Sequence, residues 1–187
     1  MKEQASSMQG LKFDDIEKNN QTQTGGKRCK HLIFSLADER YGIPLSAVKE
    51  VIGLTDITPV PNVPAFFKGL INLRGKIISI IDLRSKLSLP LTDYQSKKTS
   101  IIITEIQNLV LGTIVDDVNE VAGFNSDQIE ETLEIQNNVS RDFITGVAKT
   151  EAKKLILLLD IGKALSIEEL TMIRGKSNVR SEETASV

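Results

Sequence analysis

The sequence has few side chains that could serve as soft metal ligands or redox groups. Its 187 residues include one cysteine, Cys29, and one histidine, His31. A zinc site built from cysteine and histidine takes four such ligands, and a disulfide takes two cysteines. We therefore expect no structural metal, no disulfide framework and no cofactor. The lack of cysteine pairs is typical of a reducing compartment such as the cytoplasm.

Aromatic residues, excess basic charge and long apolar runs are also scarce. Aromatics make up 4% of the chain, tryptophan is absent, and the net charge is −2. Nucleic-acid binding uses a basic face and aromatic stacking platforms, so we expect no nucleic-acid partner. No stretch reaches the roughly 18 apolar residues of a membrane-spanning helix, and the N-terminus lacks the apolar core of a signal peptide. We expect a cytoplasmic protein that does not insert into a membrane.

What is present is a long apolar centre between two polar ends. Residues 1–28 are rich in Gln, Lys, Asn and Thr, which predicts a disordered tail. The segment EELTMIR predicts a short C-terminal helix, so 171–187 is assigned to the end of that helix and a flexible tail. The ordered domain is expected over 29–170, where the apolar content is sufficient for a packed core.

Most of the central segment consists of short runs typical of strands. HLIFSL alternates, which puts Leu32, Phe34 and Leu36 on the core face of a strand and His31 on the other face. TSIIITEI, LVLGTIV and KKLILLL are β-branched or leucine-rich runs of strand length. The sequence therefore predicts a mostly β protein.

The sequence also contains an internal repeat. YGIPLSAVKEVIGL at 41–54 aligns with LGTIVDDVNEVAGF at 111–124 without a gap, at a shift of 70 residues. Further on, SIIDLRSKLSL aligns with LLLDIGKALSI after the shift slips to 78 residues. One unit used twice predicts two similar β modules, with sequence halves of about 30–98 and 99–165. All-β units of this size usually close into barrels, which removes exposed sheet edges.

The repeat gives several polar and glycine positions a structural interpretation. Ser46 and Asp116 precede segments with valines at helical spacing, so we expect them to be the N-caps of two short helices. Gly53 and Gly123 then fall where such helices would end.

Asp82 and Asp160 allow two interpretations. Each ends a strand and precedes a short helical pattern, as an N-cap does, and both recur as scaffold residues would. The alternative is an enzyme that uses these carboxylates or His31 for acid–base chemistry, which would require the side chains to converge in one pocket. An oligonucleotide-binding barrel is a third class, and the charge and missing aromatics disfavour it.

Arg74 lies in the stretch NLRGK, which the second half does not copy. A phosphate-binding loop would need several glycines opening a helix, whereas here a single glycine precedes an apolar strand. Arg74 is then either a solvated turn residue or a docking residue, since arginine is enriched at protein interfaces. Glu50 has the same two interpretations, and we expect Lys49 and Glu50 to face outward.

The stretch ITPVPNVPAFFKGLINLRGKIISIIDLRSKL at 57–87 resembles the signature of the CheW family, the coupling proteins of bacterial chemotaxis. The resemblance continues through LVLGTIVDDVNEVAGF and FITGVAKTEAKKLILLLDIGKAL and covers about 30–170. With no receiver-like, phosphotransfer or ATPase segment, the chain is similar to the stand-alone adaptor of the family.

The resemblance implies an all-β fold with short helices, in which two intertwined five-stranded SH3-like barrels pack around a shared core. It implies no enzymatic activity and no cofactor. It implies a scaffold that couples chemoreceptors (methyl-accepting chemotaxis proteins) to the histidine kinase CheA. The groove between the barrels would accept the receptor, and one barrel would meet a barrel of the kinase's regulatory domain.

The resemblance also assigns site residues by their place in the matching motifs. The receptor-binding positions that it implies are Val48, Glu50, Arg74, Val115 and Val118. The kinase-binding positions that it implies are Ile57 and Pro59 in the proline-rich loop.

Overall fold

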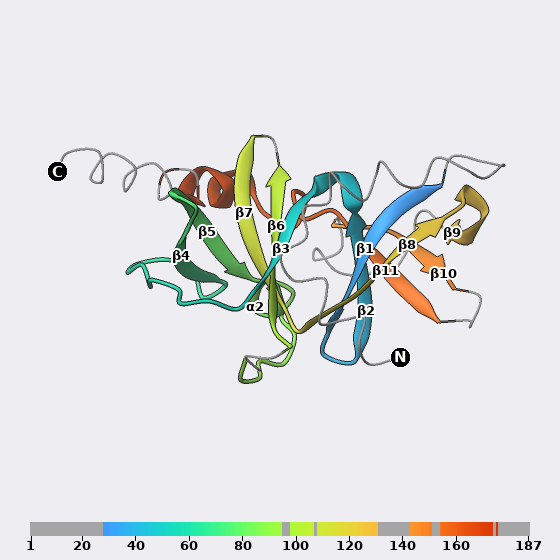
Figure 1. The fold of residues 1–187 in the computed structure, drawn as a ribbon, viewed down its shortest axis with the longest axis horizontal. Helices are drawn as coiled ribbons and strands as arrows, with labels where there is room; N and C mark the ends of the chain where they lie inside the picture. The colour runs from blue at the N-terminus through green and yellow to red at the C-terminus, as the bar shows by residue number, and fades with distance from the viewer. Residues whose placement is uncertain are drawn as a thin grey trace.

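The computed structural model describes residues 28–94, 98–106, 108–130, 143–150, 154–173 and 175. Nearly all of the predicted tail over 1–28, and most of 171–187, lie outside the described residues. Within the described residues the strands form two sheets that lie side by side, with a few short helices (Figure 1). This confirms the predicted all-β fold class.

Each sheet mixes strands from distant parts of the chain. The first sheet has the spatial order β8 (Asp117–Phe124), β1 (Cys29–Leu36), β2 (Glu39–Pro44), β11 (Leu155–Leu159), β10 (Ile144–Lys149) and β9 (Ile129–Glu130). The second has the order β3 (Val48–Gly53), β6 (Ser100–Ile106), β7 (Leu109–Val115), β5 (Lys76–Asp82) and β4 (Phe67–Leu73). The first sheet exceeds the expected five strands because the two-residue β9 pairs with β10.

The repeat explains this mixing. β1 and β2 of the first copy share a sheet with β8, β10 and β11, while β6 and β7 share a sheet with β3, β4 and β5. Each sheet therefore combines a hairpin from one half with strands from the other half. In both sheets one parallel pairing joins the two contributions, β11 with β2 and β5 with β7. The halves 30–98 and 99–165 each supply both sheets, so the two modules are intertwined.

The helices predicted after Ser46 and Asp116 are wrong, because strands β3 and β8 occupy these positions. In β3, Val48 pairs with Thr104 and Glu50 with Ile103, so that Lys49 is the extra residue of a β-bulge. In β8, Asn119 is the extra residue of an equivalent bulge. A bulge interrupts the alternation of a strand and brings valines three residues apart to one face, which imitates helical spacing.

The predicted caps at these positions are wrong for the same reason. Ser46 lies in η2 (Leu45–Ala47), a single 3-10 turn without a side-chain cap. Gly53 and Gly123 lie within strands and end no helix. The described chain also contains α2 (Leu83–Lys86), η3 (Ser126–Gln128) and a helix over 167–173, and the last of these confirms the predicted C-terminal helix.

The buried side chains form three clusters that match two barrels and a shared core. The largest lies between the sheets and contains Leu32, Phe34 and Leu36 of β1. A second cluster is formed by strands of the second sheet, and a third, which contains Ile33, by strands of the first. β1 is therefore covered on both faces. His31, predicted on the face away from the core, is 6% exposed because that face lines the interior of the first sheet.

Candidate functional site

Glu50 and Arg74 meet at one end of the second sheet. Arg74 Nη2 lies 2.9 Å from Glu50 Oε2, and Nη1 donates to Oε1 at 3.2 Å. The expectation that Glu50 faces outward is wrong: it is 7% exposed, because the bulge at Lys49 rotates it off the solvent face. The Nη1–Oε1 contact is a charge-assisted hydrogen bond, and the Nη2–Oε2 contact is an ion pair without hydrogen-bond geometry.

The turn between β4 and β5 presents the Arg74 side chain. Arg74 and Gly75 have φ values of 52° and 84°, the left-handed pair of a tight hairpin turn. Asn72 Oδ1 accepts a hydrogen bond from the Gly75 N–H at 2.8 Å and fixes the turn. The Arg74 side chain is 60% exposed, whereas that of Glu50 is 10% exposed. A buried carboxylate thus holds an exposed arginine, whose guanidinium carries five donors.

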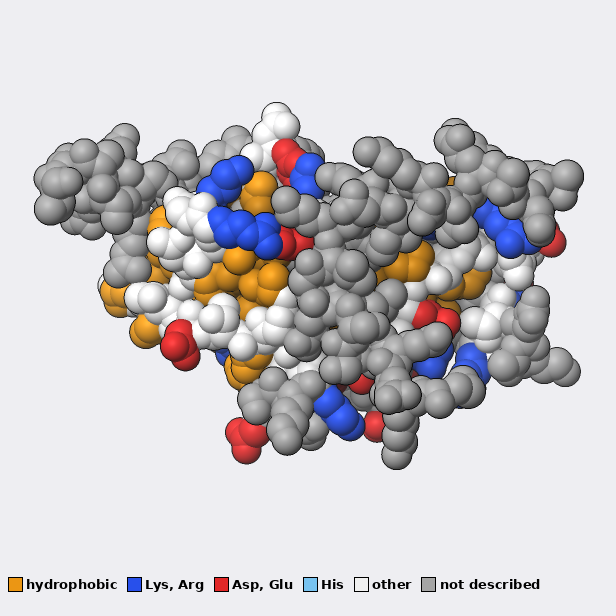
Figure 2. Space-filling view, viewed as in Figure 1, with side chains coloured by type: hydrophobic (Ala, Val, Ile, Leu, Met, Phe, Trp, Pro, Cys, Tyr) orange, Lys and Arg blue, Asp and Glu red, His pale blue; other side chains and the backbone are white. Residues whose placement is uncertain are grey.

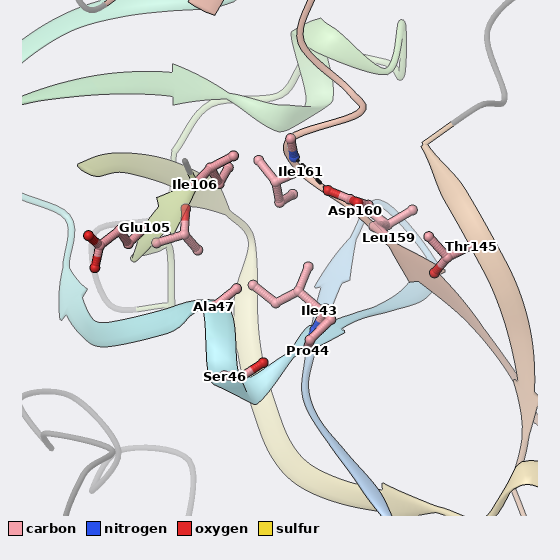
Figure 3. Close-up of a pocket in the computed structure, with 12 residues that line it drawn as sticks. Ile43, Pro44, Ser46, Ala47, Glu105, Ile106, Thr145, Leu159, Asp160 and Ile161 are labelled. Atoms are coloured by element: carbon pink, nitrogen blue, oxygen red, sulfur yellow. Dashed lines mark hydrogen bonds between the residues drawn. The ribbon is translucent and has the colours of Figure 1, made fainter. Parts of the chain in front are cut away.

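A groove of about 270 Å³ lies between the two sheets (Figure 3). Ile43, Ile106 and Ile161 point toward one another in it, and the carboxylate of Glu105 points away. The complete lining is Ile43, Pro44, Ser46, Ala47, Thr104, Glu105, Ile106, Thr145, Leu159, Asp160, Ile161 and Gly162. An apolar floor with a few polar groups at its rim is the usual composition of a binding groove.

The ion pair lies one strand away from the groove. Val48 pairs with Thr104 in the β3–β6 ladder, and Thr104 lines the groove. Glu50 pairs with Ile103, one position further along β6. Figure 2 shows basic side chains next to acidic ones over the second sheet, with hydrophobic side chains beside them. The structure thus places Glu50, which holds the exposed arginine of the β4–β5 turn, on the strand next to the groove.

Three of the predicted receptor-binding residues lie in the shared core. Val48, Val115 and Val118 are 6%, 1% and 4% exposed. Each packs in the cluster between the sheets, and none lines the groove. In this conformation the protein's own side chains cover them, so their contact with a partner stays a prediction.

The loop with Ile57 and Pro59 is tied to the edge of the second sheet. Thr58 exchanges two backbone hydrogen bonds of 2.9 Å with Leu70 of β4. Gly69 has a φ of 145°, and a Cβ there would lie 2.1 Å from the Thr58 carbonyl oxygen. Pro59 is exposed, while Ile57 is half-buried against the interior of the second sheet. The loop presents Pro59 on a fixed backbone.

Asp82 and Asp160 are caps, as predicted. Asp82 Oδ1 accepts from the N–H groups of Arg84 and Ser85, at 2.9 and 3.3 Å. Asp160 Oδ1 accepts from the Gly162 and Lys163 N–H groups, at 2.9 and 3.3 Å. A carboxylate that satisfies backbone donors has a structural role.

Asp82 has further partners. Its Oδ2 accepts from the Tyr94 hydroxyl at 2.7 Å and lies 3.6 Å from Lys68 Nζ. Burial and this hydrogen bond raise the pKa of Tyr94.

His31 lies apart from both carboxylates on β1, beside the Phe124 ring, and burial lowers its pKa. In the described part of the chain, no three His, Cys, Asp or Glu side chains are grouped as a metal site would require.

Asp116, predicted as a helix cap, forms a different contact that the sequence reasoning missed. Arg84 Nε donates to Asp116 Oδ1 at 2.6 Å, and Arg84 Nη2 contacts Oδ2. Asp116 Oδ2 also accepts from the Ala37 N–H at 2.7 Å. Arg84 carries the signal that drew attention to Arg74: the second half has Gly162 at its place, so it does not recur.

No helix among the described residues is both long and apolar enough to cross a membrane. Residues 30–169 match the family model of the CheW-like domain. The chain is 35% identical over 142 residues to the chemotaxis protein CheW of Klebsiella aerogenes, which covers 76% of this chain and 84% of that protein. It is 34% identical over 152 residues to CheW of Thermotoga maritima, which covers 80% and 94%.

A solved structure gives the same result. The scaffolding protein TtCheW from Thermoanaerobacter tengcongensis is similar with a TM-score of 0.70 and 35% identity, over 76% of this chain and 96% of that one. The duplicated strands, the two intertwined sheets and the matching segment around Arg74 agree with these comparisons. The chain belongs to the CheW family of chemotaxis scaffold proteins.

Proposed function

We propose that the protein is a non-catalytic cytoplasmic adaptor that couples chemoreceptors to the histidine kinase CheA. The single observation that carries this proposal is the combination of the apolar groove with the Glu50–Arg74 pair, whose glutamate lies on the adjoining strand β3. Membership of a chemotaxis scaffold family supports it. In this role the protein binds no cofactor and no nucleic acid, and reaches the membrane through its receptor.

The receptor contact is proposed at the groove between the sheets. Ile43, Ile106 and Ile161 provide an apolar floor that fits one face of an amphipathic helix. Arg74 supplies an exposed planar cation for an acidic residue at the edge of that helix. Glu50 holds the guanidinium in position, and Val48 lies in the core next to the groove, since its strand partner Thr104 is part of the lining. Val115 and Val118 flank Asp116 at the other end of the strands, so a receptor contact with them would lie outside the groove.

The kinase contact is proposed at the loop that carries Ile57 and Pro59, where a barrel of the kinase's regulatory domain would dock. Neither Ile57 nor Pro59 lines the groove, and Thr58 fixes the loop on β4. A rigid, partly apolar loop loses little conformational entropy on binding. Separate contacts for receptor and kinase would let one molecule bind both.

Reconstitution of a receptor fragment with CheA, with and without this protein, tests the proposal. We expect receptor-dependent kinase activity when all three are present and its loss when the adaptor is omitted. Equal kinase activity with and without the adaptor would contradict the proposal.

Thr145→Arg tests the groove, because it places a long cation on an exposed residue of the lining. Thr171→Arg is a matched control. Thr171 is likewise an exposed threonine whose hydroxyl donates to a main-chain carbonyl, that of Ile167 at 2.8 Å, as Thr145 donates to Leu158 at 3.3 Å. We expect Thr145→Arg to weaken receptor binding and Thr171→Arg to leave it unchanged. Equal binding by both folded variants would place the receptor elsewhere.

A further inference from the structure

The internal repeat relates the two ends of the interface between the sheets. The two ends nevertheless differ in the residues that line them. The chain crosses from the first sheet to the second at η2, and from the second back to the first at Asp116. A shift of 70 residues places Ser46 of η2 on Asp116, and a shift of 78 places Arg84 on Gly162. Ser46 and Gly162 both line the groove. Arg84 and Asp116 line a polar cleft at the other end.

The Asp116 end is bridged by a hydrogen-bonded ion pair beside the polar cleft. Asp116 holds Arg84 of α2, which belongs to the second sheet's side, through Nε and Nη2. The same carboxylate accepts from the Ala37 N–H in the β1–β2 turn of the first sheet, and the Asp116 N–H donates to the Ser35 carbonyl at 3.1 Å. Asp116 thus bonds to both sheets at once. We call this contact between Ala37, Arg84 and Asp116 the clamp.

Arg84 is held tightly within the clamp. It is 8% exposed, and its Nη1 donates to the Pro90 carbonyl at 2.6 Å. The hydrogen bond to Asp116 raises the pKa of the guanidinium further, so Arg84 remains protonated. Removing Asp116, which is half-buried, would leave the buried Arg84 without its charge partner, which favours a local rearrangement.

The clamp and the groove lie at opposite ends of the same strands. β2 begins after Asp38, which lines the cleft at the clamp, and ends at Pro44, which lines the groove. β6 likewise begins after Thr99 in the cleft and ends at Ile106 in the groove. Figure 1 shows α2 and the β1–β2 turn at one end of the interface, and η2 at the other. The packed strands β2 and β6 thus connect the clamp directly to the groove.

We propose that Arg84 and Asp116 are positioning residues: the clamp sets the separation of the two sheets and thereby the width of the groove. The consequence for receptor binding rests on the proposed function, whereas the effect on the separation of the sheets does not. The clamp also makes the two ends of a duplicated fold different. It bridges the two sheets at the end that has Arg84, whereas Gly162 at the other end has no side chain that could form such a bridge.

The separation can be measured directly with spin labels at Thr145 of β10 and Lys76 of β5, both exposed, in a Cys29→Ser background. We expect a single narrow distance distribution that shifts and broadens in Asp116→Asn, which removes the charge and keeps the shape. Asp116→Glu restores the charge and should recover most of the narrow distribution. Glu120→Gln, which breaks the exposed Arg40–Glu120 pair on the first sheet, is the control and should change nothing. An unchanged distribution in Asp116→Asn would overturn the clamp.

Binding of a receptor fragment to the unlabelled variants tests the consequence. We expect Asp116→Asn to weaken it about fivefold or more, as conformational coupling commonly does. If Asp116→Asn fails to fold, Arg84→Lys provides the same test, since a single ammonium cannot make the two-point contact. A shifted distance distribution with unchanged affinity would overturn the link to the groove. Failure of the wild-type protein to bind the fragment would instead contradict the proposed function and leave the distance result standing.

Discussion

β3 and β8 are copies of one segment, and each holds a glutamate paired with an arginine from elsewhere. Glu50 of β3 pairs with Arg74, and the side chains are 10% and 60% exposed. Glu120 of β8 pairs with Arg40 at 3.2 Å, and there the glutamate is 55% exposed and the arginine 37%. In β3 the carboxylate is buried and the arginine projects, while in β8 both ends of the pair are in solvent.

This difference supports the proposal that the Arg74 end of the duplicated scaffold is the docking end. Exposed ion pairs contribute little, about 0–1 kcal/mol, and hold neither partner rigidly. A buried carboxylate with a hydrogen bond to its arginine restricts the orientation of that arginine, which would lower the entropic cost of the proposed docking. The duplicated strands are scaffold, and the unduplicated turn around Arg74 distinguishes the two copies.

The largest expected loss of stability comes from placing a charged residue in the core between the two sheets. Val118→Asp, in the shared core, should lower the free energy of unfolding by more than about 3 kcal/mol, because a carboxylate would be buried without a partner. Urea unfolding followed by circular dichroism measures this loss. Asn119→Asp is the control: its side chain lies at the bulge and can still accept from the Ser35 hydroxyl. Equal stability of both variants would show that Val118 is not in a core.

Gly42 and Gly112 are equivalent in the internal repeat and allow the packing inside the two sheets to be compared. A Cβ at Gly112 would lie 2.5 Å from Ile80 Cδ1 and 2.8 Å from Ile101 Cγ2. At Gly42 the nearest atoms, Leu158 Cδ2 and Ile33 Cδ1, lie at 3.0 and 3.1 Å. We expect Gly112→Ala to cost about 2–3 kcal/mol by overpacking, and Gly42→Ala about 1 kcal/mol. Thermal unfolding of both variants tests this order, and the reverse order would contradict it.

The two capping residues, Asp82 and Asp160, predict a smaller difference in stability between the two copies, and the larger loss is again expected in the second sheet. Asp82 accepts from two N–H groups and the Tyr94 hydroxyl in a buried site, whereas Asp160 caps a half-buried turn. Asp82→Ala should cost about 2 kcal/mol and Asp160→Ala about 1 kcal/mol. Denaturant midpoints at pH 7 report both values. A larger loss for Asp160→Ala would show that the extra partners of Asp82 add nothing.

The smallest expected effect is a pH dependence of the free energy of unfolding that comes from His31, a residue that the second copy lacks. His31 occupies the place that Ile101 has in the other half, and burial lowers its pKa below 6.5. The unfolded state then binds a proton that the folded state resists. The contribution of His31 is fully present above about pH 6.5 and is lost as the pH falls from there toward the folded-state pKa. In His31→Gln, this part of the pH dependence of unfolding should vanish. An identical pH profile in the variant would refute the assignment.

Much of the fold follows from the sequence because strand patterns and the repeat are local and periodic. The alternation in HLIFSL located β1, and the two Asp caps followed from their place after strands. The helices predicted after Ser46 and Asp116 failed because a bulge depends on the partner strand, which local spacing does not contain. Glu50 was misplaced for the same reason.

The site was predictable in part. Arg74 stood out because it does not recur, and the same criterion applied to Arg84 would have found the clamp. Its pairing with Asp116 requires α2 and the β7–β8 crossing to meet, which is a tertiary contact between residues 32 apart in sequence. The pairing of Glu50 with Arg74 likewise depends on how β3 closes against the β4–β5 turn.

The most direct test of the docking end is the receptor affinity of Arg74→Glu and Arg40→Glu, measured side by side by titration calorimetry on folded proteins. Both variants reverse an arginine that is paired with a copy of the same glutamate, so they differ in location and not in chemistry. We predict that Arg74→Glu loses receptor binding by tenfold or more, which corresponds to about 1.4 kcal/mol, while Arg40→Glu binds like the wild type. Equal affinities of the two variants would contradict the account.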